Sequence, residues 1–103
     1  TYSIHDIRHI LGAQWLRQSN GNPAVEYLLF DSRQVTAPAL SLFFALPGER
    51  HDGHKYLNEA YRAGVRHFVV QYPDVDLSSL HDANVLLVPD SLAALQQLAA
   101  HHR

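Results

Sequence analysis

Residues 31–54 read DSRQVTAPALSLFFALPGERHDGH and hold two polar segments, each of which follows an apolar run. The apolar run Leu42–Leu46 predicts a strand buried on both faces, as in parallel sheets covered by helices. The loop after it carries two glycines, two imidazoles, an arginine and two acids. Asp31-Ser32-Arg33 follows another apolar run, Tyr27–Phe30, in the same way. Because ligands of open α/β sheets bind at the carboxyl ends of strands, the two polar segments predict a binding site at one sheet edge.

The flanking sequence alternates helix and strand patterns. Ser3 and Asp6 mark the N-cap and first turn of a helix that Gly12 ends. Short strands are expected around residues 15–16, at 67–70 and at 85–88, with a helix between 56 and 64. A last helix opens at 89–91, and its core face is predicted to hold Leu92, Leu95, Leu98 and Ala99.

The fold class predicted from this order is α/β. We expect a small, mostly parallel sheet of about four to five strands flanked by helices, in one domain spanning 1–103. The link from Leu46 to His67 is long enough for a crossover between parallel strands. The aromatic residues are expected in or near the core: Tyr2, Trp15, Tyr27, Phe30, Phe43, Phe44 and Phe68.

Composition excludes several classes of protein. The chain has 103 residues, 47% of them hydrophobic, which argues against disorder. A formal net charge of −2 indicates neither a nucleic-acid nor a membrane partner. No cysteine is present, so disulfides and cysteine-ligated zinc are excluded. The apolar runs are too short to cross a bilayer and no signal peptide is visible, so a cytoplasmic location is expected.

The loop from Gly48 to Gly53 has the glycine spacing of a phosphate-binding P-loop. A P-loop places lysine and then Ser or Thr directly after the second glycine, whereas His54-Lys55-Tyr56 follows here. Without those two side chains, the β/γ-phosphates and Mg²⁺ lose their ligands. We therefore interpret the glycines as residues that permit unusual backbone angles in a strand-to-helix loop.

His51 and His54 flank Asp52, which also raises the possibility of a metal site. The other histidines are scattered over separate predicted elements, and zinc needs three or four ligands in a defined geometry. The sequence thus favours loop geometry over a metal centre: Asp52 can accept backbone N–H bonds. Asp31 and Ser32 can likewise fix a turn through side-chain-to-backbone bonds, and their functional interpretation depends on the second loop lying nearby.

In order and spacing, these motifs resemble the N-terminal domain of the Mur ligases of peptidoglycan synthesis. The motifs are Asp31-Ser32-Arg33, Leu42–Gly48, Asp52-Gly53-His54 and Ala60–Val65, followed by residues 88–91 before a leucine-bearing helix. Within the family, the loop at 48–54 is most similar to members that add D-alanyl-D-alanine to the UDP-N-acetylmuramoyl-tripeptide, some of which are fused to an alanine racemase. The members that add the third amino acid share the domain type and remain an alternative.

The resemblance implies a substrate-anchoring domain that binds the UDP group of UDP-N-acetylmuramoyl-tripeptide. Carried over by position, the contacts to the uridine are Ser32, Glu49, Arg50 and His51, and Arg33 or Arg50 is expected to contact the diphosphate. Loop geometry is assigned to Asp31, Gly48, Asp52, Gly53 and His54. No catalytic residue, metal or cofactor is expected here, because ATP and Mg²⁺ belong to the central and C-terminal domains of the parent ligase. The rival interpretation is a protein-interaction module without a small-molecule site.

Overall fold

A computed structural model describes residues 2–19, 23–30, 35–47 and 56–102 of the chain. Its main sheet has five strands in the order β2-β7-β6-β5-β4. They are β2 (Gln14–Arg17), β4 (Tyr27–Leu29), β5 (Ser41–Phe44), β6 (His67–Val70) and β7 (Asn84–Leu87). The helices are α1 (Ile4–Leu11), α2 (Leu57–Arg62) and α3 (Ser91–His102), with a 3₁₀ turn, η2 (Pro38–Leu40), before β5.

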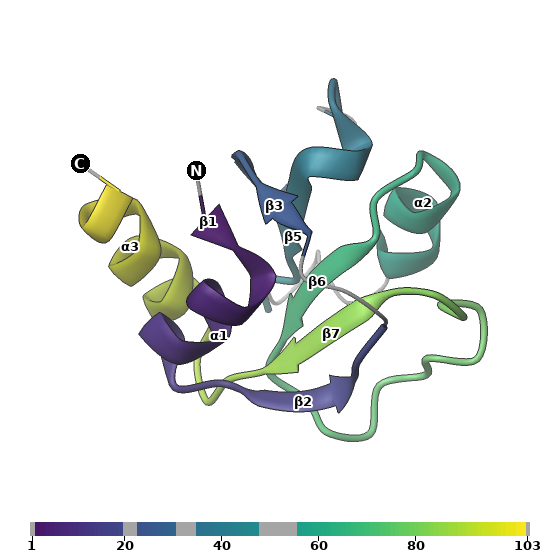
Figure 1. The fold of residues 1–103 in the computed structure, drawn as a ribbon. Coiled ribbons are helices and arrows are strands. Elements are labelled where there is room, and N and C mark those ends of the chain that lie inside the picture. Colours follow the sequence, from purple (N-terminus) through teal and green to yellow (C-terminus); the bar gives the residue numbers. More distant parts are fainter. Residues whose placement is uncertain (1, 20–22, 31–34, 48–55, 103) are drawn as a thin grey trace.

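Strands β4 to β7 run parallel and β2 joins β7 antiparallel. The predicted α/β class with a mostly parallel sheet is therefore confirmed. A separate antiparallel pair joins β1 (Tyr2–Ser3) to β3 (Ala24–Val25). Figure 1 shows this small pair beside α1, where it joins the N-terminal strand to the segment that leads into β4.

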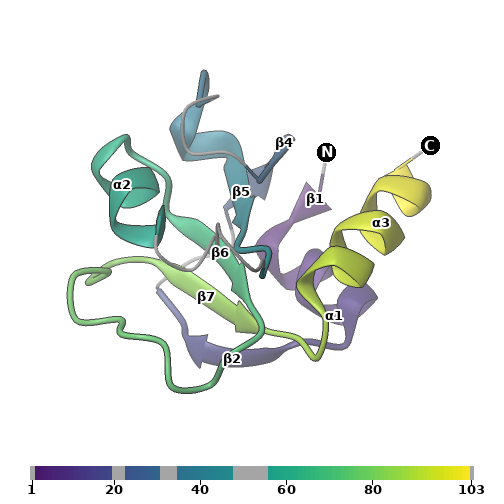
Figure 2. The ribbon, with the colours of Figure 1, turned by 180° about the vertical axis from the view of Figure 1, so that it is seen from behind.

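Helices cover both faces of the sheet, as the buried apolar strands require. One core packs α1 and α3 against one face through residues such as Ile7, Phe44 and Leu98. The other core packs α2 and the segment before β7 against the opposite face, around Phe43 and Phe68. Figures 1 and 2 show α1 and α3 together on one side and α2 on the other. Successive side chains of β5 point to opposite faces of the sheet, and helices cover both faces, so all four residues of β5 are buried.

Local sequence signals set the ends of α1 as expected. The Ser3 hydroxyl accepts a hydrogen bond from the Asp6 N–H, and the Asp6 carboxylate accepts one from the Ser3 N–H, a capping box. Gly12 ends the helix with a φ of 63°, the left-handed conformation that glycine adopts without steric cost. At the end of α2, Gly64 has a φ of 109°.

Three predicted core positions are wrong. Tyr27 and Phe30 are 46% and 57% exposed, because β4 lies at the edge of the sheet and only β5 pairs with it. Leu92 is 47% exposed, because α3 turns Ser91 and Ala94 toward the core beside the correctly predicted Leu98. Edge position and helix phase are tertiary properties, which an apolar run does not specify.

Candidate substrate-binding edge

Strands β4 and β5 are parallel neighbours, with Leu29 opposite Phe43. Their carboxyl ends therefore lie side by side at one edge of the sheet. Phe30 and Pro47 are the last described residues before the two polar segments, and both are exposed. The structure thus brings together, at one edge, the two strand ends from which these segments continue.

The predicted site residues themselves all lie outside the described part of the chain. This applies to the proposed substrate contacts Ser32, Arg33, Glu49, Arg50 and His51, and to the loop residues Asp31, Gly48, Asp52, Gly53 and His54. Their roles stay predictions. The described residues define the scaffold from which the two segments depart.

A buried serine ties the carboxyl end of β5 to its neighbours. Ser91 is 0% exposed, and its hydroxyl lies 2.8 Å from the carbonyl oxygen of Ala45, just after β5. The same hydroxyl lies 2.9 Å from Oε1 of Gln71, just after β6, and Oε1 also accepts the Ser91 N–H at 2.9 Å. The ends of β5 and β6 are therefore fastened to the start of α3, and we call these contacts the Ser91 clamp.

The helix cap of α3 is made by a different side chain. Oδ1 of Asp90 accepts the Ala93 N–H at 3.0 Å, the bond of an N-cap residue. Because Asp90 caps the helix, the Ser91 hydroxyl is free to bond across the sheet. The sequence predicted the helix start at these residues, but Gln71 carried no local signal of its part in the clamp.

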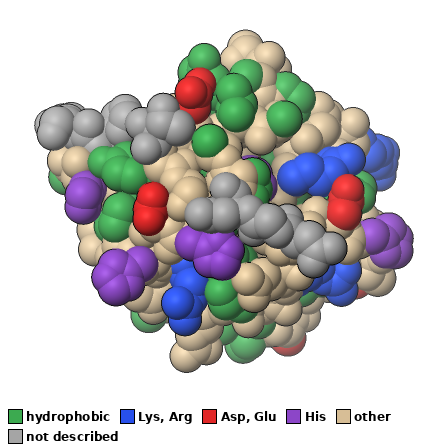
Figure 3. All heavy atoms as spheres, viewed as in Figure 1, with side chains coloured by type: hydrophobic (Ala, Val, Ile, Leu, Met, Phe, Trp, Pro, Cys, Tyr) green, Lys and Arg blue, Asp and Glu red, His purple; other side chains and the backbone are tan. Residues whose placement is uncertain are grey.

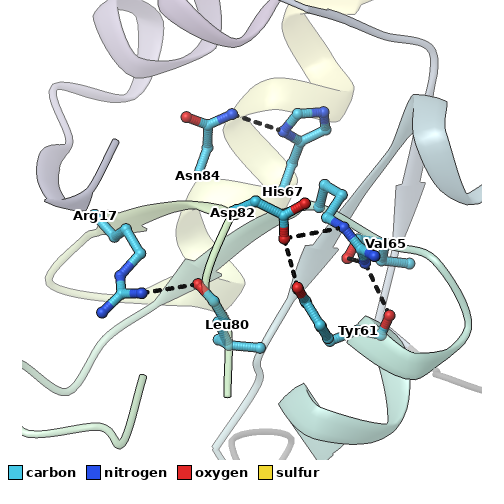
Figure 4. A network of polar contacts seen from close by, with 8 residues as sticks. Arg17, Tyr61, Val65, His67, Leu80, Asp82 and Asn84 are labelled. Atoms are coloured by element: carbon cyan, nitrogen blue, oxygen red, sulfur yellow. Dashed lines mark hydrogen bonds and ion pairs between the residues drawn. The ribbon is translucent and has the colours of Figure 1, made fainter. Parts of the chain in front are cut away.

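The opposite end of the sheet holds a buried polar pair. Oδ1 of Asn84 accepts the Ser19 N–H at 2.8 Å, so its Nδ2 faces Nδ1 of His67 at 3.2 Å. An amide nitrogen donates, so Nδ1 accepts and the imidazole carries its proton on Nε2. Figure 4 shows the two side chains pointing toward one another from adjacent strands.

Burial lowers the pKa of His67 below its ordinary value, since His67 is only 3% exposed. A hydrogen bond with the backbone of Ala39 opposes part of that pKa shift. In the neutral ring, Nδ1 can accept the hydrogen bond from Asn84 Nδ2. In a protonated ring, Nδ1 would carry a hydrogen that points at the Asn84 Nδ2 donor. This pair is therefore part of the scaffold, at the end of the sheet away from the β4 and β5 carboxyl ends.

A second polar group fixes α2 to the segment before β7. The Tyr61 hydroxyl donates to Asp82 at 2.5 Å, and Arg66 Nε lies 3.3 Å from the same carboxylate oxygen. The Arg66 guanidinium also lies 3.9 Å from the centre of the Tyr61 ring. The Tyr61 bond lowers the pKa of Asp82 and raises that of Tyr61. Figure 4 shows these side chains pointing toward one another from α2, from the residue before β6 and from the segment before β7.

The described residues offer no metal centre. Within residues 2–19, 23–30, 35–47 and 56–102, no group of three His, Asp or Glu side chains is placed to hold a metal ion. On the face drawn in Figure 3, the histidines of the described part of the chain lie at several separate points. No helix in this part of the chain is long and apolar enough to cross a membrane.

Comparison with known proteins identifies the family. The family described as "Mur ligase family, catalytic domain" matches residues 24–103. The chain belongs to the Mur ligase family. It is 43% identical over 90 residues to the UDP-N-acetylmuramoyl-tripeptide–D-alanyl-D-alanine ligase of Bacillus subtilis, a match that covers 84% of this chain and 19% of that protein.

Relatives of a second type are also similar to this Mur ligase chain. The UDP-N-acetylmuramoyl-L-alanyl-D-glutamate–2,6-diaminopimelate ligase of Clostridium botulinum is 33% identical over 78 residues, covering 76% of this chain and 16% of that protein. The fold matches a crystal structure of MurF from Acinetobacter baumannii with a TM-score of 0.76 at 24% identity, covering 97% of this chain and 20% of that one. The chain thus spans about a fifth of the length of the proteins it matches.

Proposed function

We propose that this chain is the substrate-anchoring domain of a Mur ligase and binds the UDP group of a UDP-N-acetylmuramoyl-peptide. The observation that carries the proposal is the parallel pairing of β4 and β5, which puts both strand ends at one edge. The two sequence motifs that resemble the family continue from these strand ends. In open α/β sheets, ligands bind where such strand ends and their loops converge.

In this proposal, the side chains of two segments hold the nucleotide. Ser32, Glu49 and His51 hydrogen-bond the uracil and ribose. Arg33 or Arg50 contacts the diphosphate, and a well-formed charge-assisted hydrogen bond contributes about 1.5–3 kcal/mol. Loop geometry is maintained by the remaining polar and glycine residues, Asp31, Gly48, Asp52, Gly53 and His54.

The reaction of the longer protein is proposed to be amide formation with D-alanyl-D-alanine in peptidoglycan precursor synthesis. Support comes from the loop at 48–54 and from the 43% identity to the Bacillus subtilis ligase of that type. ATP and Mg²⁺ are assigned to other domains of that protein. The second candidate is addition of the third amino acid, because a 2,6-diaminopimelate ligase from Geobacillus kaustophilus is 42% identical over 79 residues.

An NMR titration of the labelled chain with UDP and with ADP tests the binding proposal. We expect UDP to shift the amides of Leu29, Phe30, Ala45 and Leu46, with a Kd in the high micromolar to millimolar range, because one domain supplies only part of the pocket. ADP should bind more weakly, since groups that hydrogen-bond uracil stay unpaired against adenine. Ser32→Ala should weaken UDP binding.

Ser78→Ala is the matched control, because Ser78 is exposed and lies in the segment before β7. It should leave the UDP affinity unchanged. Equal responses to UDP and ADP, or shifts confined to other surfaces, would contradict the proposal and favour the protein-interaction module.

A further inference from the structure

We infer that Ser91, through the Ser91 clamp, is a positioning residue for the proposed nucleotide site. The inference rests on the proposed function, because it concerns how the carboxyl end of β5 is held for the segment that follows. Ser91 contacts no substrate in this proposal. Its role is to fix the backbone at Ala45, two residues before the last described residue, Pro47.

The geometry shows that the end of β5 depends on this side chain. The Ala45 N–H donates to the Val69 carbonyl at 2.9 Å, which continues the ladder with β6. The Ala45 carbonyl accepts the Ser91 hydroxyl at 2.8 Å, and Ala45 is 0% exposed. Removing the hydroxyl would leave a buried carbonyl without this partner, which costs about 1–3 kcal/mol unless the backbone moves.

Gln71 keeps the serine in place. Its Oε1 accepts the Ser91 N–H at 2.9 Å, which fixes the start of α3 against the end of β6. The single hydroxyl hydrogen of Ser91 faces two acceptors, Ala45 O at 2.8 Å and Gln71 Oε1 at 2.9 Å. Gln71 Oε1 already accepts the Ser91 N–H. The bond to the Ala45 carbonyl is therefore the contact for which Ser91 needs its hydroxyl.

The chain contains a matched control at the other end of the same strand. Ser41 is also 0% exposed, and its hydroxyl donates to the Ala37 carbonyl at 2.7 Å. Both serines are buried, and both hydroxyls donate to a backbone carbonyl. Ser41 begins β5 and Ser91 holds its end, so the two differ in which end of the strand they secure.

The experiment compares Ser91→Ala and Ser41→Ala in the 103-residue chain by two measurements. The first is the Kd for UDP, which we expect Ser91→Ala to raise by about fivefold or more and Ser41→Ala to change by less than about twofold, given ordinary hydrogen-bond strengths. The second is the amide ¹⁵N shift of Leu46, which reports on hydrogen bonding to the Ala45 carbonyl. It should move in Ser91→Ala and stay in place in Ser41→Ala.

Ser91→Thr, which keeps the hydroxyl, should restore UDP affinity toward that of the unsubstituted chain. The inference is overturned if both alanine variants lower UDP affinity equally, or if Ser91→Ala moves the Leu46 shift without changing the Kd. If the unsubstituted chain binds no UDP, the proposed function fails instead, and the two failures are distinguishable. If Ser91→Ala does not fold, unchanged UDP affinity in folded Ser91→Cys, whose thiol is a weaker donor, overturns the inference.

Discussion

Asn84→Ala is predicted to destabilise the fold strongly, because one buried amide satisfies two partners. Asn84 is 2% exposed; its Oδ1 accepts the Ser19 N–H and its Nδ2 donates to His67. Each lost hydrogen bond costs about 1 kcal/mol, and leaving a buried acceptor unpaired adds more. Ser19 is half-buried and His67 is only 3% exposed, so Nδ1 of His67 is the more deeply buried of the two groups left unpaired.

The expected loss is about 2–3 kcal/mol in the free energy of unfolding, or about 10–20 °C in Tm for a domain of this size. Urea unfolding followed by circular dichroism measures it. Asn58→Ala is the control, because Asn58 is exposed on α2 and its amide bonds only the Ser79 hydroxyl among the contacts described. Alanine has the higher helix propensity, so this control should change stability by less than about 0.5 kcal/mol. A loss below about 1 kcal/mol for Asn84→Ala, or equal losses in both variants, would refute the reasoning.

Three further predictions concern the scaffold. Because the pKa of His67 is lowered in the folded state, the free energy of unfolding should stay constant above the ordinary histidine pKa near 6.5 and fall as the pH drops below it. Urea unfolding at pH 7.5, 6.5 and 5.5 measures this slope, and His67→Gln should flatten it. Phe43→Ala should lower the free energy of unfolding by about 3–5 kcal/mol, since Phe43 is 0% exposed. Phe30→Ala should change it by less than about 0.5 kcal/mol, since Phe30 is 57% exposed, and similar losses in both variants would contradict the assigned cores. Gly64→Ala should lower the free energy of unfolding by about 1–3 kcal/mol, because φ is +109° and the new Cβ would lie 2.9 Å from Pro38 Cβ. An unchanged Tm, measured by calorimetry, would count against this.

The sequence predicted the elements that carry strong local signals. The capping box at Ser3 and the glycine stop at Gly12 set α1, and the continuous apolar run at Leu42 marked β5 as fully buried. The expected convergence of two strand ends followed from the general rule for open α/β sheets, and the pairing of β4 with β5 supports it.

Other features depend on residues far apart in the chain and left no local pattern. The β1–β3 pair has two residues in each strand, too few for a periodic signal. Asn84 and His67 are isolated polar residues at strand starts, and only the strand register makes them partners. The Ser91 clamp similarly joins positions 45, 71 and 91, which meet only once the sheet has formed.

A crystal structure of the chain with UDP would test the nucleotide site most directly. We predict that the uracil lies at the carboxyl ends of β4 and β5, within hydrogen-bond distance of the Ser32 side chain, with an arginine from position 33 or 50 on the diphosphate. UDP bound at another surface, or bound at this edge through the diphosphate alone with the uracil in solvent, would contradict the assignment of this edge as a uridine site.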